Sequence, residues 1–145
     1  MTTAREGIAD LVHRYSDAVV HQDRERWSAC WAEDALWELG PGRLLVGRRV
    51  IVEHWQASMD KIDVVVQLVC NGQATVSGSE AEGRWYITEH VRRTNGELGL
   101  LLAYYDDTYT CSEGRWLFSS RRLVPIYHGP SDLSAAFRLP PASGQ

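Results

Sequence analysis

The sequence predicts an α+β protein in which a strongly curved antiparallel sheet wraps over three N-terminal helices and forms a cone with an internal pocket. Two observations support this prediction. Apolar residues recur at helical spacing up to about residue 59, and from about residue 64 onward the pattern is that of long strands separated by turn residues. Helices followed by a run of strands are typical of α+β domains, because strands joined by short turns pair antiparallel.

Three segments have the spacing of amphipathic helices. The first covers residues 5–21, and the third covers residues 48–59. A second, shorter helix is predicted over residues 24–32, because apolar side chains recur there three and four positions apart. The residues that define its buried face are Trp27, Cys30 and Trp31.

The strands follow from β-rich runs between turn signals. The predicted strands cover residues 35–39, 43–46, 64–76, 82–93, 98–111 and 115–127. Asn95-Gly96 is the strongest short hairpin signal in the chain. The last two strands carry apolar or aromatic residues on both faces. One face covers the helices, so we expect the other face to be buried in a homodimer or homotrimer.

Length and composition restrict the class of protein. At 145 residues we expect a single domain over residues 5–140, with loose termini at 1–4 and 141–145. The net charge is −4 and there is no basic stripe, so nucleic acid is not an expected partner. No apolar run is long enough to span a membrane, and the first residues lack the apolar segment of a signal peptide. We therefore expect a cytoplasmic protein with free thiols at Cys30, Cys70 and Cys111.

Several segments together resemble a known family. They are YSDAVVHQD, WAEDALWEL, GRRVIVEHW, AYYDDTY and GRWLFSSRR. With them the chain, from about Ile8 to Pro140, resembles the SnoaL-like branch of the nuclear-transport-factor-2-like superfamily. That branch includes polyketide cyclases, scytalone dehydratase, bile-acid dehydratase and hexachlorocyclohexane dehydrochlorinase. The resemblance implies an α+β cone, a site inside the cone that needs no cofactor, and oligomers built on the sheet.

The resemblance also implies roles for individual residues. Asp23 falls where the dehydrochlorinase and the dehydratases keep the aspartate of a catalytic His–Asp pair, and Trp37 falls on a pocket tryptophan. Gln67 occupies the position of the histidine, with Asn71 four residues further along the strand. Because a glutamine has no titratable proton near neutral pH, the chain departs here from the His–Asp mechanism.

Asp23 has two interpretations. A carboxylate that faces an apolar cone has a raised pKa and suits a base for proton abstraction, and Gln67 could orient it through an amide N–H. An aspartate directly before a helix also caps that helix, and the two roles can coexist. His21 and His54 are alternatives for the missing histidine.

The long strand around residue 105 supplies further polar candidates. Strand alternation places Tyr105 and Asp107 on one face, where the relatives carry a tyrosine and an acid or amide. Inside an apolar cone Asp107 needs a partner, and Arg121 or Tyr15 could supply one. A register shifted by one residue would make Asp106 the inward acid instead.

Aromatic side chains complete the predicted pocket. Tyr15, on the buried face of the first helix, can donate its O–H to a substrate oxygen. Trp37, Trp85 and Tyr105 are candidates for an aromatic lining, and each also fits a plain core position. Trp85 and Glu89 share one face of their strand, and alternation leaves open whether that face points inward.

No motif predicts a metal ion or an organic cofactor. The five histidines lack the HxH and HxxxH spacings of metal ligands, and the chain has no P-loop, dinucleotide-binding motif or G-x-S-x-G. We therefore expect neither kind of group to be bound.

These observations favour a cofactor-independent lyase or isomerase that binds a small, largely apolar molecule and removes a proton, with elimination, isomerisation or ring closure to follow. Asp23 is the preferred base, while Tyr15 and Asp107 polarise or protonate the substrate. An alternative is an epoxide-hydrolase-like enzyme in which Asp107 and Arg121 activate water, and another is a non-catalytic ligand-binding or assembly domain, which the glutamine at position 67 favours. The candidates for substrate binding are Trp37, Gln67, Asn71, Trp85, Tyr105 and Arg121.

Overall fold

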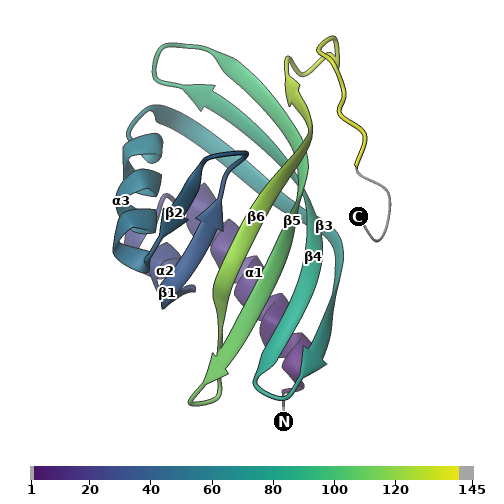
Figure 1. Ribbon diagram of the computed structural model, residues 1–145. Coiled ribbons are helices and arrows are strands. Elements are labelled where there is room, and N and C mark those ends of the chain that lie inside the picture. Colours follow the sequence, from purple (N-terminus) through teal and green to yellow (C-terminus); the bar gives the residue numbers. More distant parts are fainter. Residues whose placement is uncertain (1, 141–145) are drawn as a thin grey trace.

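Figure 1 shows the computed structural model of the protein, which describes residues 2–140. Three helices and two strands form the first part of the chain, and four long strands follow. The helices are α1 (Ala4–Val20), α2 (Arg24–Ser28) and α3 (Arg48–Met59). The strands are β1 (Trp31–Glu38), β2 (Leu44–Val46), β3 (Ile62–Ser77), β4 (Glu80–Arg93), β5 (Leu98–Ser112) and β6 (Arg115–Gly129).

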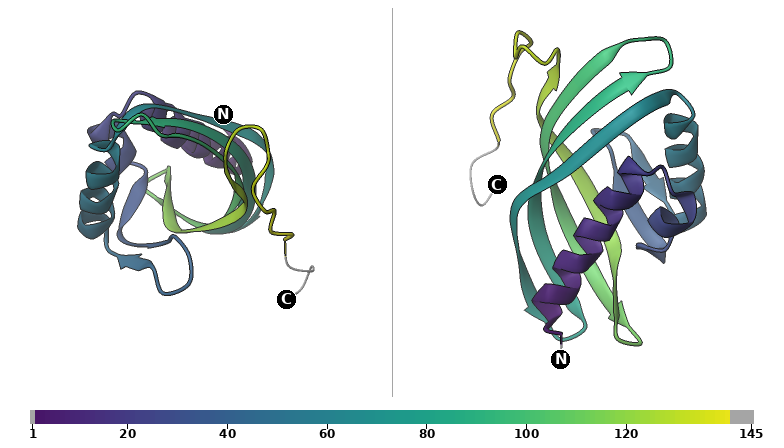
Figure 2. Two further views of the ribbon diagram at one scale, coloured as in Figure 1. Left: turned by 90° about the horizontal axis from the view of Figure 1, so that it is seen from above. Right: turned by 180° about the vertical axis from the view of Figure 1, so that it is seen from behind.

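The strands form one sheet in the order β2-β1-β6-β5-β4-β3. Neighbouring strands pair antiparallel, except that β1 and β6 run parallel with Trp31 opposite Phe118. The sheet curves strongly without closing, α1 crosses one of its faces, and α2 and α3 lie at its side (Figure 2). This arrangement confirms the predicted α+β fold, in which a curved sheet wraps over three helices. We call the sheet face that α1 covers the inner face, and the opposite one the outer face.

Local signals specify the start of α1. Thr3 and Glu6 form a capping box, in which Glu6 N–H donates to Thr3 Oγ1 at 3.1 Å and Thr3 N–H donates to Glu6 Oε2 at 2.9 Å. The helix therefore begins inside residues 1–4, for which we expected a loose terminus, and the other expected loose segment, 141–145, lies outside the described residues. Within residues 2–140, no helix has the length and apolar character needed to cross a membrane.

The second helix is shorter than its pattern predicts. It ends at Ser28, and β1 begins at Trp31, earlier than the predicted strand. The reason lies far along the chain, because Phe118 N–H donates to the Cys30 carbonyl at 2.9 Å and draws this segment into parallel pairing with β6. A tertiary partner thus overrides helical spacing, since local propensity is only a weak preference.

The remaining elements agree with their local signals. α3 covers the predicted residues 48–59, and the ends of β3 to β6 lie within two residues of the predicted ranges. In the hairpin between β4 and β5, Gly96 adopts a φ of 90° and Glu97 N–H donates to Asn95 Oδ1 at 2.9 Å. Asn-Gly supports such a turn because both residues tolerate positive φ.

Aromatic rings join the helices to β1. Trp27 of α2 stacks on Trp55 of α3 with ring centroids 4.5 Å apart. The ring centroids of Trp31 and Trp37 in β1 lie 5.5 and 5.4 Å from that of Trp27, and the ring centroid of Tyr15 in α1 lies 5.3 Å from it. This aromatic cluster forms one wall of the cone, and polar groups are gathered on the adjoining inner face.

Candidate active site

The inner face of β5 carries the row of side chains that alternation predicted. Tyr105, Asp107 and Tyr109 are at most 4% exposed. Asp106 is on the outer face, where its side chain is 26% exposed. The inward acid is therefore Asp107, and the alternative register with Asp106 inside does not occur.

The register of β4 settles the orientation that the sequence left open. Trp85 pairs with Tyr105, and Glu89 pairs with Gln67 of β3 on the other side. Partners in a register share a face of the sheet, so Trp85, Ile87 and Glu89 all face inward. Glu89 thereby joins the candidate site, although the sequence did not single it out.

Asp107 forms a buried ion pair with Arg121, which lies directly opposite it on β6. Arg121 Nε donates to Asp107 Oδ1 at 2.7 Å, and Arg121 Nη2 donates to Oδ2 at 3.1 Å. Tyr109 O–H donates to the same Oδ2 at 2.8 Å. Neither charged side chain is more than 1% exposed. The forked geometry and the third hydrogen bond offset the cost of burying two charges.

Burial and ion pairing have opposite effects on the pKa values of Asp107 and Arg121. Burial raises the pKa of Asp107, and although Arg121 and Tyr109 oppose the rise, the pKa stays above its ordinary value. Burial lowers the pKa of Arg121, but Asp107 and the nearby tyrosines outweigh this effect and the pKa lies above its ordinary value. Arg121 is therefore a permanent cation in the interior of the cone.

Aromatic rings enclose the guanidinium of Arg121. Its Cζ lies 3.7 Å from the ring centroid of Tyr105, 4.1 Å from that of Phe118 and 4.4 Å from that of Tyr15. Cations are attracted to aromatic faces, more strongly when both are desolvated. The buried Nη1 of Arg121 has no hydrogen-bond partner within residues 2–140. One charged donor of the interior thus has no partner among the described residues.

Tyr15 and Tyr105 are neutral donors beside this cation. Burial raises the pKa of both phenols, Glu89 adds to the rise, and Arg121 opposes it. Both hydroxyls therefore stay protonated at neutral pH and can donate to an oxygen of a ligand. The structure thus brings four of the predicted site residues together, namely Tyr15, Tyr105, Asp107 and Arg121.

Gln67, in the position of the family histidine, is 5% exposed and bonded at both ends of its amide. Ser16 Oγ donates to Gln67 Oε1 at 2.7 Å, and Gln67 Nε2 donates to Glu89 Oε1 at 3.0 Å. The expected hydrogen bond from Gln67 to Asp23 does not occur among the described residues, because these two partners occupy the amide. The sequence analysis did not single out Ser16, and it left open which way Glu89 points, which only the pairing of β4 with its neighbours decides.

Asp23 is the N-cap of α2. Its Oδ1 accepts the N–H of Arg26 at 3.1 Å, and its own N–H donates to the Ala18 carbonyl at 2.9 Å. The residue is partly exposed at the joint between α1 and α2. Within residues 2–140, no hydrogen bond or ion pair links it to Gln67 or Arg121.

The other predicted site residues lie in different places. Trp37 and Trp85 are 6% and 9% exposed, and their indole N–H groups have no partner in the described part of the chain. Asn71 is exposed in a bulge of β3 between Val69 and Gly72, so the structure does not bring it to the inner face.

The two histidines considered as replacements are not part of the inner cluster. His21 is exposed beside Asp17, and His54 packs edge-on against Trp37 with ring centroids 6.1 Å apart. Over residues 2–140, no group of three His, Cys, Asp or Glu side chains is placed to hold a metal ion.

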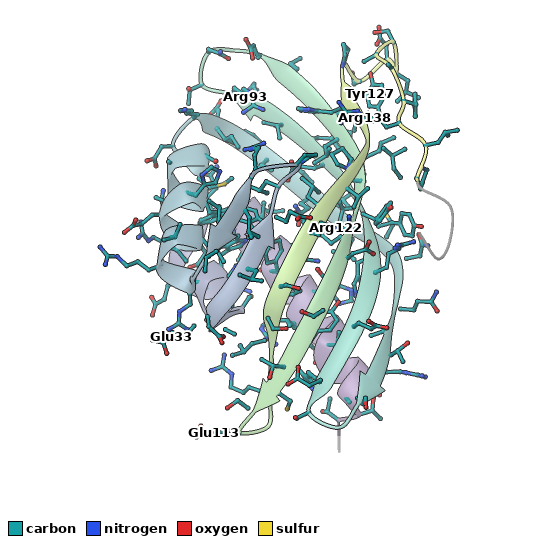
Figure 3. The ribbon with its side chains drawn as sticks, in the orientation of Figure 1. Glu33, Arg93, Glu113, Arg122, Tyr127 and Arg138 are labelled. Atoms are coloured by element: carbon teal, nitrogen blue, oxygen red, sulfur yellow. The ribbon has the colours of Figure 1, made fainter. Side chains whose placement is uncertain are left out.

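Three pockets formed by the described residues open outside the space between α1 and the sheet. The largest of the three, of about 750 Å³, is a groove on the outer face lined by residues that include Glu38, Arg84, Asp106 and Arg122. Figure 3 shows Arg122 on this face, in front of β6. Strands β3 to β6 extend beyond the end of α1 (Figure 2).

The chain is similar to a known protein family and to many solved structures. A family model described as a SnoaL-like domain matches residues 1–122. No curated protein sequence matches the chain. Several hundred solved chains are similar in structure, among them scytalone-dehydratase-like proteins, dehydrochlorinases and dehydratases of the nuclear-transport-factor-2-like family.

Three of these structures illustrate the range. A proposed scytalone dehydratase from Novosphingobium aromaticivorans has a TM-score of 0.83 and 22% identity, with 94% of this chain and 93% of that chain covered. A protein of unknown function from Mycobacterium tuberculosis has a TM-score of 0.75 and 27% identity, covering 90% and 75%. A LinA-type3 hexachlorocyclohexane dehydrochlorinase from Novosphingobium barchaimii has a TM-score of 0.75 and 20% identity, covering 93% of each. With the family match over most of its length, the chain belongs to the SnoaL-like domain family.

Proposed function

We propose that the protein is a cofactor-independent enzyme, a lyase or isomerase of the dehydratase or cyclase type, which removes a proton from a carbon atom of a small, largely apolar molecule in the cone. The observation that carries this proposal is the buried donor cluster of Arg121, Tyr15 and Tyr105, in which Arg121 Nη1 has no partner among the described residues. Donors held in a dry interior stabilise negative charge that develops on a substrate oxygen.

The chemistry follows from where the electrons go. When a proton leaves a carbon next to a carbonyl, the C–H electron pair moves onto the carbonyl oxygen. The hydroxyls of Tyr15 and Tyr105 can donate to that oxygen, and the charge of Arg121 favours the anion. Loss of a leaving group then gives elimination, reprotonation at a conjugated carbon gives isomerisation, and attack on a second carbonyl gives ring closure.

The other residues have supporting roles in this proposal. Asp107 fixes Arg121 through the two-pronged ion pair, and Trp37 and Trp85 contribute apolar wall. The base is a carboxylate, and the sequence favours Asp23, which falls at the aspartate of the family's His–Asp pair. The Oδ2 atom of Asp23 makes no hydrogen bond within residues 2–140, while Oδ1 caps α2.

Exchange of carbon-bound hydrogen tests the proposal without knowledge of the natural substrate. Compact apolar ketones, namely 2-tetralone, phenylacetone and 2-cyclohexenone, are incubated with the protein in D₂O, and loss of the α-proton signal is followed by NMR. We expect exchange above the protein-free rate, reduced by about 10²–10³ in Tyr15→Phe because an oxyanion donor is lost. Tyr86→Phe is the matched control, because Tyr86 packs on Tyr104 on the outer face. No exchange by the wild type with any of the three ketones would refute the proposal.

Two other functions have some structural support. An epoxide hydrolase is favoured by the buried Asp107–Arg121 pair, but among the described residues no second carboxylate pairs with Arg121. A non-catalytic role is favoured by the apolar and aromatic side chains that are packed between the helices and the sheet. Incubation with limonene epoxide in ¹⁸O-labelled water tests the epoxide-hydrolase function, since a protein that activates water forms labelled diol faster than the protein-free control.

A further inference from the structure

We propose that Glu89 is the carboxylate that takes the substrate proton, and that Gln67 is the residue that positions it. This assignment rests on the proposed function and names the base of that site. It places the base on β4, opposite the residue that stands in the histidine position, instead of at the joint between α1 and α2.

The hydrogen bonds around Gln67 fix the direction of this interaction. An ionised carboxylate can only accept, so the amide must present Nε2 to Glu89 Oε1, at 3.0 Å. That orientation leaves Gln67 Oε1 for the hydroxyl of Ser16, which donates at 2.7 Å. The three groups therefore satisfy one another when Glu89 is a carboxylate, and the amide is held from both sides.

Glu89 has one oxygen engaged and one available. Within residues 2–140 no donor bonds Oε2, and the residue is partly exposed. Its surroundings are largely apolar, with Ile87 before it in the same strand and Leu101 opposite it on β5. Burial raises the pKa of Glu89 above its ordinary value, against the opposing effects of Gln67 and Arg93. A carboxylate whose anion is destabilised in this way is a stronger base than one in water.

The position of Glu89 suits a base that works with the donor cluster. Leu101, which lies opposite Glu89, and Tyr105 are on the same face of β5, so Glu89 and Tyr105 share the inner face of the sheet. The contact of Gln67 with Ser16, near the end of α1, places Glu89 where the sheet leaves the cover of that helix. A ligand there has a carboxylate on one side and neutral donors on the other.

The proton transfer is balanced without a further reactant. Glu89 Oε2 forms a bond to the proton, the C–H bond breaks, and its electron pair moves to the carbonyl oxygen, which accepts hydrogen bonds from the phenols. The carboxylic acid then returns a proton to the same or a conjugated carbon. In D₂O the acid exchanges its proton with solvent before return, so the product carries deuterium.

The test compares Glu89→Gln with Glu82→Gln in the exchange assay with 2-tetralone, phenylacetone and 2-cyclohexenone. Both glutamates belong to β4, but Glu82 is exposed on the outer face, which makes it the matched control. We expect Glu89→Gln to lose about 10²–10⁴ in rate, as loss of a base does, and Glu82→Gln to match the wild type. Glutamine preserves the shape of the side chain and can still accept the N–H of Gln67. Glu89→Asp is a second variant. It keeps the charge, but its shorter side chain moves the carboxylate oxygens away from the substrate, so the exchange rate should also fall.

The pH profile separates positioning by Gln67 from a structural role. Gln67→Leu removes a donor to the carboxylate, so the rising limb of rate against pH should shift to higher pH, and a structural role alone would lower the rate without moving the limb. Wild-type rate in Glu89→Gln, with exchange present in the wild type, would overturn this assignment and leave the proposed function standing. Loss of rate in Asp23→Asn but not in Glu89→Gln would return the base role to Asp23. No exchange in the wild type would overturn both.

Discussion

Asp106 and Asp107 are consecutive residues on opposite faces of β5, and each lies opposite an arginine of β6. The cost of burying a charge can therefore be measured by comparing the inner pair, Asp107–Arg121, with the outer pair, Asp106–Arg122. Asp107→Asn leaves Arg121, which is 1% exposed, without its counter-charge. Asp106→Asn leaves Arg122, whose side chain is 52% exposed and reaches water.

The two substitutions should differ severalfold in the stability that they remove. Removing one partner of a buried ion pair costs about 3–5 kcal/mol of stability, because the remaining charge stays desolvated. Exposed pairs contribute about 0.2–1 kcal/mol each, so Asp106→Asn should cost about 1 kcal/mol although Asp106 also contacts Arg84. The double variant Asp107→Leu with Arg121→Met removes both charges and should be clearly more stable than Asp107→Asn.

Urea unfolding followed by tryptophan fluorescence measures these differences. The chain has six tryptophans, several of them in the aromatic cluster, so the signal reports on the core. A loss of about 3–5 kcal/mol is a large share of the about 5–15 kcal/mol typical of a domain, and the midpoint should fall accordingly. The reasoning fails if Asp107→Asn and Asp106→Asn differ by less than about 1 kcal/mol, or if the double variant is no more stable than the single one.

Three further predictions concern stability and assembly. Because folding raises the pKa of Glu89, its ionised form destabilises the fold above that pKa. Glu89→Gln should therefore raise the melting temperature at pH 8, with a gain that shrinks as the pH falls toward the ordinary value of 4.5; an equal gain at all pH values would contradict this. Asp23→Ala should lose about 1 kcal/mol in urea unfolding and Asp23→Asn almost none, because asparagine also caps helices; equal losses would argue against the cap. Light scattering at micromolar concentration should give a dimer or trimer of the 16.4 kDa chain, since apolar side chains such as Leu44 and Leu68 are 52% exposed, whereas a clean monomer would count against the interface.

Local patterns were sufficient for most of the fold. α3 and the hairpin at Asn95-Gly96 depend on helical spacing, alternation and turn chemistry, all of which act within a few residues. The end of α2 could not be predicted in this way. The spacing of Trp27 and Trp31 is helical, and only the distant Phe118 makes Trp31 part of a strand.

In the candidate site, too, local patterns could predict some features, whereas others depend on contacts between distant parts of the chain. Alternation along one strand predicted that Asp107 points inward, and the cost of an unpaired buried charge predicted a partner, either Arg121 or Tyr15, of which the structure has Arg121. The hydrogen bond between Gln67 and Glu89 depends on the register of two strands, which the sequence pattern leaves unspecified at the level of single residues. The expectation that Gln67 would reach Asp23 came from resemblance, and that expectation was wrong.

The parallel pairing of β1 with β6 has a consequence for how the chain folds as it is synthesised. β1 emerges from the ribosome well before its partner β6, because β2, α3 and β3 to β5 are made in between. Until then the tryptophans of the N-terminal segment have no strand to cover them, and exposed apolar surface of this kind is prone to aggregation. Closure of β6 onto β1 is therefore a late, long-range step, of the kind that slows folding because loop entropy is lost before any contact forms. A nascent chain stalled before Phe118 would have all three helices and yet lack the strand that joins β1 to β5.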